Sequence, residues 1–161
     1  MNKVFGCRTE IIPILSDLNF AFDTGRKQYH STPILERLAG DAPSHAFKVL
    51  AITRVDLFIP ILTHVYGEAQ LGGKACIIST YRLRDGLPPM NPQEVFQCRI
   101  IKEAIHELGH TYKLRHCPDR SCIMHYCRTI EDVDKKSNQL CRYCRVLLDD
   151  ELKKMNMTTF G

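Results

Sequence analysis

The sequence predicts a mixed α/β fold in a single domain, with a twisted, mostly parallel sheet of four or five strands and one long helix. Its 161 residues are near the usual size of one domain, so residues 1–161 are assigned to a single unit. Residues 46–54 (AFKVLAITR) form a nearly continuous apolar run, which is typical of a strand covered on both faces. Residues 92–112 carry apolar side chains at helical spacing. We expect an upper part, residues 1–112, with the sheet and this helix, and a lower, cysteine-rich part, residues 113–161.

The N-terminal elements follow from local signals. Residues 8–15 (RTEIIPIL) predict a strand, and Pro13 places it at a sheet edge or strand end. Residues 31–40 (STPILERLAG) predict a short helix with a serine cap, an early proline and a terminal glycine. The apolar run 46–54 is expected to lie centrally in the sheet.

The later elements surround a turn-rich loop. Residues 64–70 and 74–80 are strand-like and are separated by Gly72 and Gly73, which predicts an antiparallel hairpin. Residues 82–92 are rich in turn formers and are expected on the surface. The long helix follows at residues 92–112, and residues 141–155 (CRYCRVLLDDELKKM) predict a last helix.

Charge and hydropathy favour a protein that acts in water. Lysine and arginine outnumber acidic residues by 22 to 18, for a formal charge of +4, which is too small a surplus to imply a nucleic-acid partner. No stretch approaches the roughly 20 apolar residues of a membrane span, and the start MNKVFGCRTE lacks the apolar run of a signal peptide. We therefore expect a cytoplasmic monomer without a membrane partner.

The cysteines are unevenly placed. The sequence has 8, of which Cys117, Cys122, Cys127, Cys141 and Cys144 fall in the last third. In a chain expected in a reducing compartment, such clustering indicates a metal before disulfides.

The long helix carries the pattern HELGH. His106 and His110 are four residues apart, so their imidazoles lie about 6 Å apart along the axis on one face and can bind one zinc ion. Glu107 projects beside them, where it could polarise a metal-bound water. A chance match on an amphipathic helix is the competing interpretation of so short a pattern.

His116 strengthens the metal interpretation only if the helix ends before it. A continued helix would place His116 about 9 Å beyond His110 and off its face. The chain must therefore turn back between Tyr112 and His116, and Pro118 downstream would stop the helix.

Residues 106–116, HELGHTYKLRH, resemble the metzincin zinc-peptidase signature HExxHxxGxxH, with every ligand position filled. The continuation, a third histidine joined to Cys-x4-Cys-x-Met and a later Cys-x2-Cys, is similar to that of the archaemetzincins. The resemblance is specific over residues 102–144 and implies a metzincin-like fold built around an active-site helix.

The resemblance also implies a role for each matching position. His106, His110 and His116 would bind a catalytic zinc, Glu107 would be the general base, and Met124 would form the Met-turn beneath the metal. The implied activity is zinc-dependent hydrolysis of peptide bonds. An extended peptide or protein substrate would pair with an edge strand above the cleft, for which residues 64–70 are the candidate.

The sequence departs from the family pattern in three places, one of which is the spacing from Met124 to Cys141, shorter than that of the family by one residue. Lys113 stands where the motif has glycine, and a side chain held in a left-handed conformation costs on the order of 1 kcal/mol. An ammonium near the metal would weaken or silence catalysis, whereas one that points outward would not. Family members also begin with a further strand and helix ahead of the region that matches Val4 onward, so we expect part of the sheet to be missing from this sequence.

Four cysteines have the spacing of a closed structural zinc site. Cys117 and Cys122, with Cys141 and Cys144, form two pairs suited to four-thiolate coordination. Such a site would hold the poorly periodic segment 117–138 to the last helix, and it brings the expected zinc count to two per chain. Disulfides, free thiols and the replacement of one ligand by Cys127 are the alternatives.

Other chemically interesting residues have simpler interpretations. Cys7, Cys76 and Cys98 sit in apolar surroundings and are expected to be buried. Tyr112 and Tyr126 could lie near a metal, but packing roles are favoured.

Three functions compete. The first is a zinc metallopeptidase. The second is a non-catalytic zinc-binding protein that retains the metzincin shell, an interpretation prompted by Lys113. The third is a small zinc module for nucleic acid. The arginines that prompt it are Arg115, Arg120, Arg128, Arg142 and Arg145. The modest net charge and the few interleaved aromatic residues argue against this third function.

Overall fold

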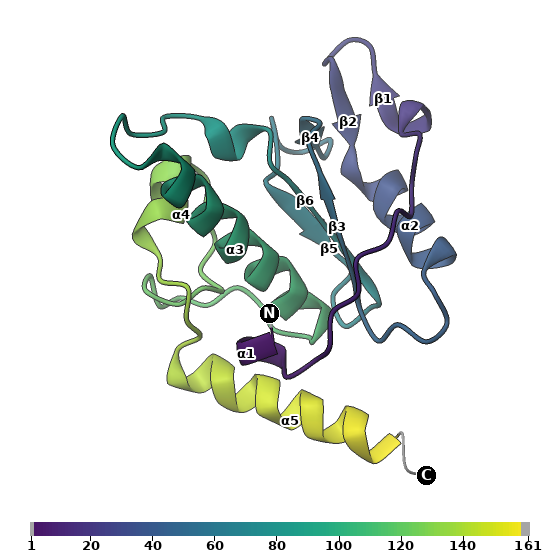
Figure 1. The fold of residues 1–161 in the computed structure, drawn as a ribbon, viewed down its shortest axis with the longest axis vertical. Coiled ribbons are helices and arrows are strands. Elements are labelled where there is room, and N and C mark those ends of the chain that lie inside the picture. Colours follow the sequence, from purple (N-terminus) through teal and green to yellow (C-terminus); the bar gives the residue numbers. More distant parts are fainter. Residues whose placement is uncertain (1, 159–161) are drawn as a thin grey trace.

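The computed structural model describes residues 2–158 (Figure 1). In chain order its helices and strands are α1 (Asn2–Phe5), β1 (Phe22–Asp23), β2 (Gln28–His30), α2 (Ser31–Asp41), β3 (Val49–Thr53), β4 (Leu57–Phe58), β5 (Gly67–Ala69), β6 (Ala75–Ser79), α3 (Pro92–Thr111), α4 (Ile130–Lys135) and α5 (Arg142–Thr158). Short 3-10 turns cover Asn19–Ala21 and Arg82–Arg84.

The strands form two small sheets, with orders β1-β2-β4 and β3-β6-β5. Each sheet has one parallel and one antiparallel pair. A single antiparallel bridge between Leu57 and Val65 links the first sheet to the chain that enters β5. The mixed α/β class is confirmed, but the strands do not form the one mostly parallel sheet that the sequence predicted. The first sheet is interrupted because β4 is only two residues long and Pro60, which cannot donate a backbone hydrogen bond, follows it.

The central strand of the second sheet is β6, whose five residues are all buried. Ala75 and Ile77 pack in one apolar cluster with Leu38 of α2, whereas Cys76 packs in another with Ile105 of α3. Because successive residues of a strand face opposite ways, β6 is covered on both faces. Figure 1 shows α2 and α3 on the two sides of this sheet.

The prediction that residues 46–54 form the central strand is wrong. β3 lies at the edge of its sheet, and Ile52 is 58% exposed. An apolar run indicates strand formation, but the order of strands depends on pairings across the chain that the run does not encode.

The hairpin predicted from residues 64–70 and 74–80 is confirmed. β5 pairs antiparallel with β6, and Gly67 lies opposite Ile78. Gly72 supplies the left-handed turn residue with a φ of 69°. The free edge of β5 is thereby left unpaired among residues 2–158.

The strand predicted at residues 8–15 is absent from the structure. Ile11 is 96% exposed and Ile12 is 42% exposed, so these two side chains do not pack on a sheet. Pro13 removes a donor that a strand would need. Ile14 and Leu15 pack partly against the cluster that contains Leu38, and Phe5 of α1 packs into the cluster with Ile105.

The predicted helices at residues 31–40, 92–112 and 141–155 correspond to α2, α3 and α5. One detail differs, because Ser31 is the first helical residue and not a cap. Its hydroxyl donates to the Phe58 carbonyl and contacts the Glu68 carboxylate. Within residues 2–158 no helix has the length and apolar character needed to cross a bilayer.

Candidate active site and metal centres

Helix α3 and the turn after it bring the three histidines together. The ring centroids of His106 and His110 are 4.7 Å apart, and His116 lies 5.3 Å and 4.8 Å from them. One ring nitrogen from each falls within 4.8 Å of the others. The structure thus places all three predicted side chains around one point.

Backbone carbonyls orient two of the rings. His106 Nδ1 lies 2.8 Å from the Ile123 carbonyl oxygen, and His110 Nδ1 lies 2.7 Å from that of Leu114. A neutral imidazole that donates from Nδ1 exposes a lone pair on Nε2. The two Nε2 atoms face each other at 3.1 Å, an arrangement that a shared cation would stabilise. The donor set therefore fits zinc.

The electrostatic surroundings keep these rings neutral. Burial, followed by the charge of Lys136, holds the pKa of His106 well below its usual range. Burial also lowers the pKa of His110, and partial burial lowers that of His116 to about 4. Neutral imidazole is the form that binds a metal.

The turn to His116 passes through Lys113. Its φ is 66°, in the left-handed region, and its backbone N–H donates to the His110 carbonyl. The Lys113 ammonium pairs with Glu151 of α5 at 2.9 Å, and its side chain is 63% exposed. The Lys113 ammonium therefore points outward, which is the arrangement that the sequence analysis expected to leave catalysis unaffected.

Glu107 is buried against the edge strand. A Cβ atom built on Gly67 of β5 would stand 2.7 Å from Glu107 Cγ, so glycine is what lets the strand and the carboxylate lie together. Burial, followed by the negative charge of Glu103, raises the pKa of Glu107 well above its usual range. A carboxyl group with raised proton affinity is suited to proton transfer.

Met124 packs against α3 at Gly109, which precedes His110. It is fully buried, and a Cβ atom on Gly109 would stand 2.5 Å from its sulfur. Gly109 therefore makes room for Met124. The Met124 carbonyl accepts a hydrogen bond from the N–H of Cys117, which ties this floor to the residue after His116.

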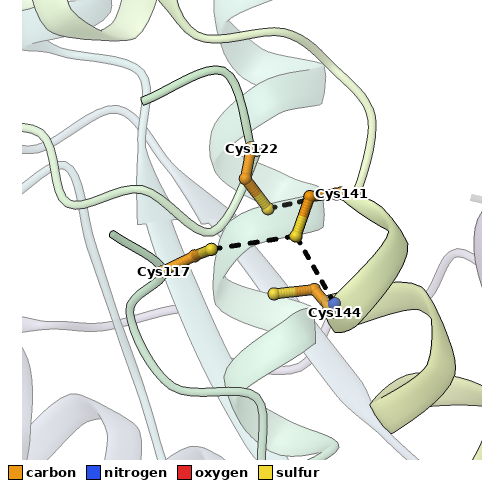
Figure 2. A group of neighbouring side chains, drawn as sticks. All are labelled: Cys117, Cys122, Cys141 and Cys144. Carbon is orange, nitrogen blue, oxygen red and sulfur yellow. Dashed lines mark hydrogen bonds between the residues drawn. The ribbon is translucent and has the colours of Figure 1, made fainter. Parts of the chain in front are cut away.

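Cys117, Cys122, Cys141 and Cys144 converge from the loop and the start of α5 (Figure 2). All four sulfurs lie within 4.8 Å of one another. The sulfurs of Cys117 and Cys141 are 3.8 Å apart, too far for a disulfide, and the cysteines are free. A tetrahedron with zinc–sulfur bonds of about 2.3 Å has edges of about 3.8 Å, so the four sulfurs fit a zinc ion.

Hydrogen bonds to sulfur support this cluster. The N–H of Cys141 donates to the sulfur of Cys122, and the N–H of Cys144 donates to the sulfur of Cys141. The bond from Cys144 is the main cause of the lowered pKa of Cys141. Cys127 does not join the group and lines the cleft instead.

The remaining cysteines and tyrosines have packing positions. Cys76 is fully buried, but Cys7 and Cys98 are only half-buried, which corrects the expectation for those two. Tyr112 stacks on Phe5 in the core. Tyr126 lies against the His116 ring, with centroids 5.0 Å apart, and so reaches the histidine site.

A cleft of about 760 Å³ contains the histidine site. The chain from Thr63 through β5 forms one wall, and residues 115–128 contribute to another, with Glu103 and Glu107 of α3 between them. The free edge of β5 thus faces the histidines.

Two cleft residues escaped the sequence analysis. Glu103 precedes His106 by three residues, so it shares the helical face of both histidines and could have been found by spacing. Lys136 pairs with Glu103 although the two residues are 33 positions apart in the sequence, and no local sequence pattern predicts this contact. Both are buried in the cleft wall.

The comparisons with known proteins agree with this geometry. The family model described as "Peptidase family M54" matches residues 25–150. The chain belongs to peptidase family M54. Among its relatives is the archaemetzincin of Methanocaldococcus jannaschii, which is 40% identical over 92% of this chain and 80% of its own length.

Solved archaemetzincin structures have the same fold. The archaemetzincin of Archaeoglobus fulgidus complexed with malonate superposes with a TM-score of 0.77 at 34% identity, over 91% of this chain and 85% of that one. That of Methanopyrus kandleri gives 0.76 at 39% identity, over 83% and 71%. The resemblance to archaemetzincins is therefore confirmed, and this M54 chain is a zinc metallopeptidase.

Proposed function

We propose that this M54 peptidase hydrolyses peptide bonds with His106, His110 and His116 as the ligands of a catalytic zinc. The main support for this proposal is that the three histidine rings converge on one point. Backbone carbonyls lie within hydrogen-bond distance of Nδ1 of His106 and of His110, and the Nε2 atoms of these two rings face each other. Zinc bound there would supply a Lewis acid toward water and a peptide carbonyl.

The protein's own groups would handle substrate and protons. An extended peptide would pair with the free edge of β5, which faces the histidines across the cleft. Glu107 would take a proton from the attacking water and deliver it to the leaving amine nitrogen. Its burial beside Gly67 holds the carboxylate in place. Met124 would support the histidine pair from below.

The second zinc would be structural. Cys117, Cys122, Cys141 and Cys144 fill a tetrahedral set and leave no open position. Elemental analysis of protein purified without added metal should find two zinc ions per chain. A value of one would leave the thiolate site alone and would contradict the catalytic assignment.

The proposed role of Glu107 is tested by substitution. Glu107→Ala should abolish hydrolysis of a peptide library, because it removes the carboxylate proposed to accept the proton, while both zinc ions remain bound. The matched control is Glu94→Ala on the exposed first turn of α3, which should cleave like the wild type. Cleavage by Glu107→Ala at the wild-type rate would refute the mechanism.

The non-catalytic alternative makes the opposite forecast. It requires a wild-type protein that holds zinc at the histidines and cleaves no peptide. The outward position of Lys113 removes the feature that prompted it. A cytoplasmic location, a monomeric state, the absence of a nucleic-acid partner and the division at residue 112 stay predictions.

A further inference from the structure

A buried ion pair forms part of the wall of the active-site cleft. Lys136 Nζ and Glu103 Oε1 are 2.9 Å apart, and their side chains are 1% and 4% exposed. Neither atom makes a well-directed hydrogen bond within residues 2–158, although the Lys136 ammonium also lies near the Cys127 thiol and interacts with it. An ammonium group has three donors, and leaving buried donors unused is costly. The pair therefore has unused hydrogen-bonding capacity in a cavity that a substrate enters.

The direction of β5 tells which part of a substrate would reach this pair. Gly67 lies against Glu107, and further along the chain the N–H of Gly72 donates to the carbonyl of His110. Tyr66, just before β5, packs with Phe96 from an earlier turn of α3. β5 and α3 therefore run the same way along the cleft.

A peptide added antiparallel to β5 would run from the His110 end toward the Glu103 end. Glu103 lies one helical turn before His106. The peptide residues after the scissile bond would therefore lie beside the Glu103–Lys136 pair. This step rests on the proposed function.

The charges that line the cleft indicate what kind of substrate residue would bind at this ion pair. Among the cleft-lining residues, the part of the wall from 115 to 136 contributes the cations Arg115, Arg128 and Lys136 and no acidic side chain. Arg115 and Arg128 form no ion pair with any residue that the structure describes. Glu68, across the cleft, is already bound by the hydroxyls of Ser31 and Thr32. An anionic group would be attracted to the wall that holds Lys136.

We propose that Lys136 anchors a carboxylate-binding subsite and that the enzyme prefers substrates with a carboxylate just after the scissile bond. The carboxylate would accept a hydrogen bond from the Lys136 ammonium, while Glu103 keeps that ammonium in place. It has two possible sources, the side chain of an aspartate or glutamate and the C-terminal carboxylate of a short leaving segment.

Four peptides separate these sources. They are identical except for glutamate or glutamine after the scissile bond and a free or amidated C-terminus. The wild type should favour a carboxylate of one source by roughly tenfold or more in kcat/KM, as expected for a hydrogen bond to a charged group. A glutamate preference in the amidated peptides identifies the side chain, and a preference for free termini in the glutamine peptides identifies the terminus.

The double substitution Glu103→Gln with Lys136→Met should abolish that preference. Changing both residues avoids leaving one buried charge without its partner. The matched control is Glu131→Gln with Lys135→Met, which changes the same charges on α4. Both residues are exposed and neither lines the cleft. The control should keep the preference.

Two outcomes would overturn the subsite: equal cleavage of all four peptides by the wild type, or an equal loss of rate for all four in the double variant with the preference retained. Peptide binding to the Glu107→Gln protein, followed by fluorescence anisotropy, separates this inference from the proposed function. If no peptide is cleaved but the carboxylate preference in binding disappears with Glu103→Gln and Lys136→Met, the peptidase mechanism fails and the subsite stands.

Discussion

Lys113 occupies a position that its side chain does not favour. The residue has a φ of 66°, where an L-residue other than glycine pays on the order of 1 kcal/mol or more. The turn is needed because it brings the Leu114 carbonyl to His110 Nδ1. The Lys113 side chain is 63% exposed in its ion pair with Glu151, so solvent screens the pair and it offsets little of that cost.

Two substitutions separate the backbone strain from the ion pair. Lys113→Ala removes the ion pair and keeps the strain, whereas Lys113→Gly removes both. The glycine variant should therefore be more stable than the alanine variant by about 1 kcal/mol in urea unfolding. Both should retain peptide cleavage near the wild-type level, because the ammonium does not reach the histidines. Equal stabilities would show that the turn is unstrained.

The segment between α3 and α5 has little regular secondary structure. It contains α4, which is only six residues long, and otherwise turns and loops. Ile123 and Met124 enter the core between two cluster cysteines, and the Ile123 carbonyl orients His106. The proposed thiolate site would thus fix an element that also orients His106, a proposed zinc ligand.

Cys122→Ser should therefore damage both sites. We expect loss of the structural zinc, a lower Tm and weaker zinc binding at the histidines, because Ile123 follows Cys122 directly. The matched control is Cys98→Ser on α3, which is half-buried and outside both clusters. Zinc content and thermal unfolding measure the effect. If Cys122→Ser kept two zinc ions and the wild-type Tm, the cluster would have no structural role.

The elements that the sequence predicted are those with local signals. α3 shows helical spacing over its whole length, and the β5–β6 hairpin is marked by paired glycines. α4 was missed although Thr129 and Asp132 form a capping box that is readable as Thr-x-x-Asp. The strand predicted around Pro13 was wrong because an apolar run does not reveal whether a partner strand exists.

The same distinction applies to the site. The ligand sets follow from the family motif or from short separations, because successive ligands within each set are three to nineteen positions apart. The Glu103–Lys136 pair depends on how α4 docks on α3. Arg99 binds the Asp134 carboxylate through two hydrogen bonds, and Lys102 binds the carbonyls of Val133 and Asp134. These long-range contacts carry no periodic signal.

At the scale of the whole molecule, the proposed catalytic carboxylate opposes folding. The pKa of Glu107 is raised above its ordinary value of 4.5 by burial and by Glu103. The folded, zinc-free protein therefore binds the Glu107 proton more tightly than the unfolded chain does. Below about pH 4.5 Glu107 is protonated in both the folded and the unfolded state, so it does not make the free energy of unfolding depend on pH. As the pH rises above 4.5, the unfolded chain ionises first and the folded state loses stability.

Glu107→Gln should consequently stabilise the zinc-free protein in a pH-dependent manner. The glutamine has nearly the same shape and cannot ionise, so the gain in the free energy of unfolding should be small at pH 4.5 and increase toward pH 7. Its slope cannot exceed about 1.4 kcal/mol per pH unit, the limit for one proton. Urea unfolding of chelator-treated protein measures it, with Glu94→Gln as the exposed control on the same helix. A gain that is constant with pH would show that Glu107 is ionised at no cost in the fold, and a gain that shrinks with rising pH would reverse the sign of its shift.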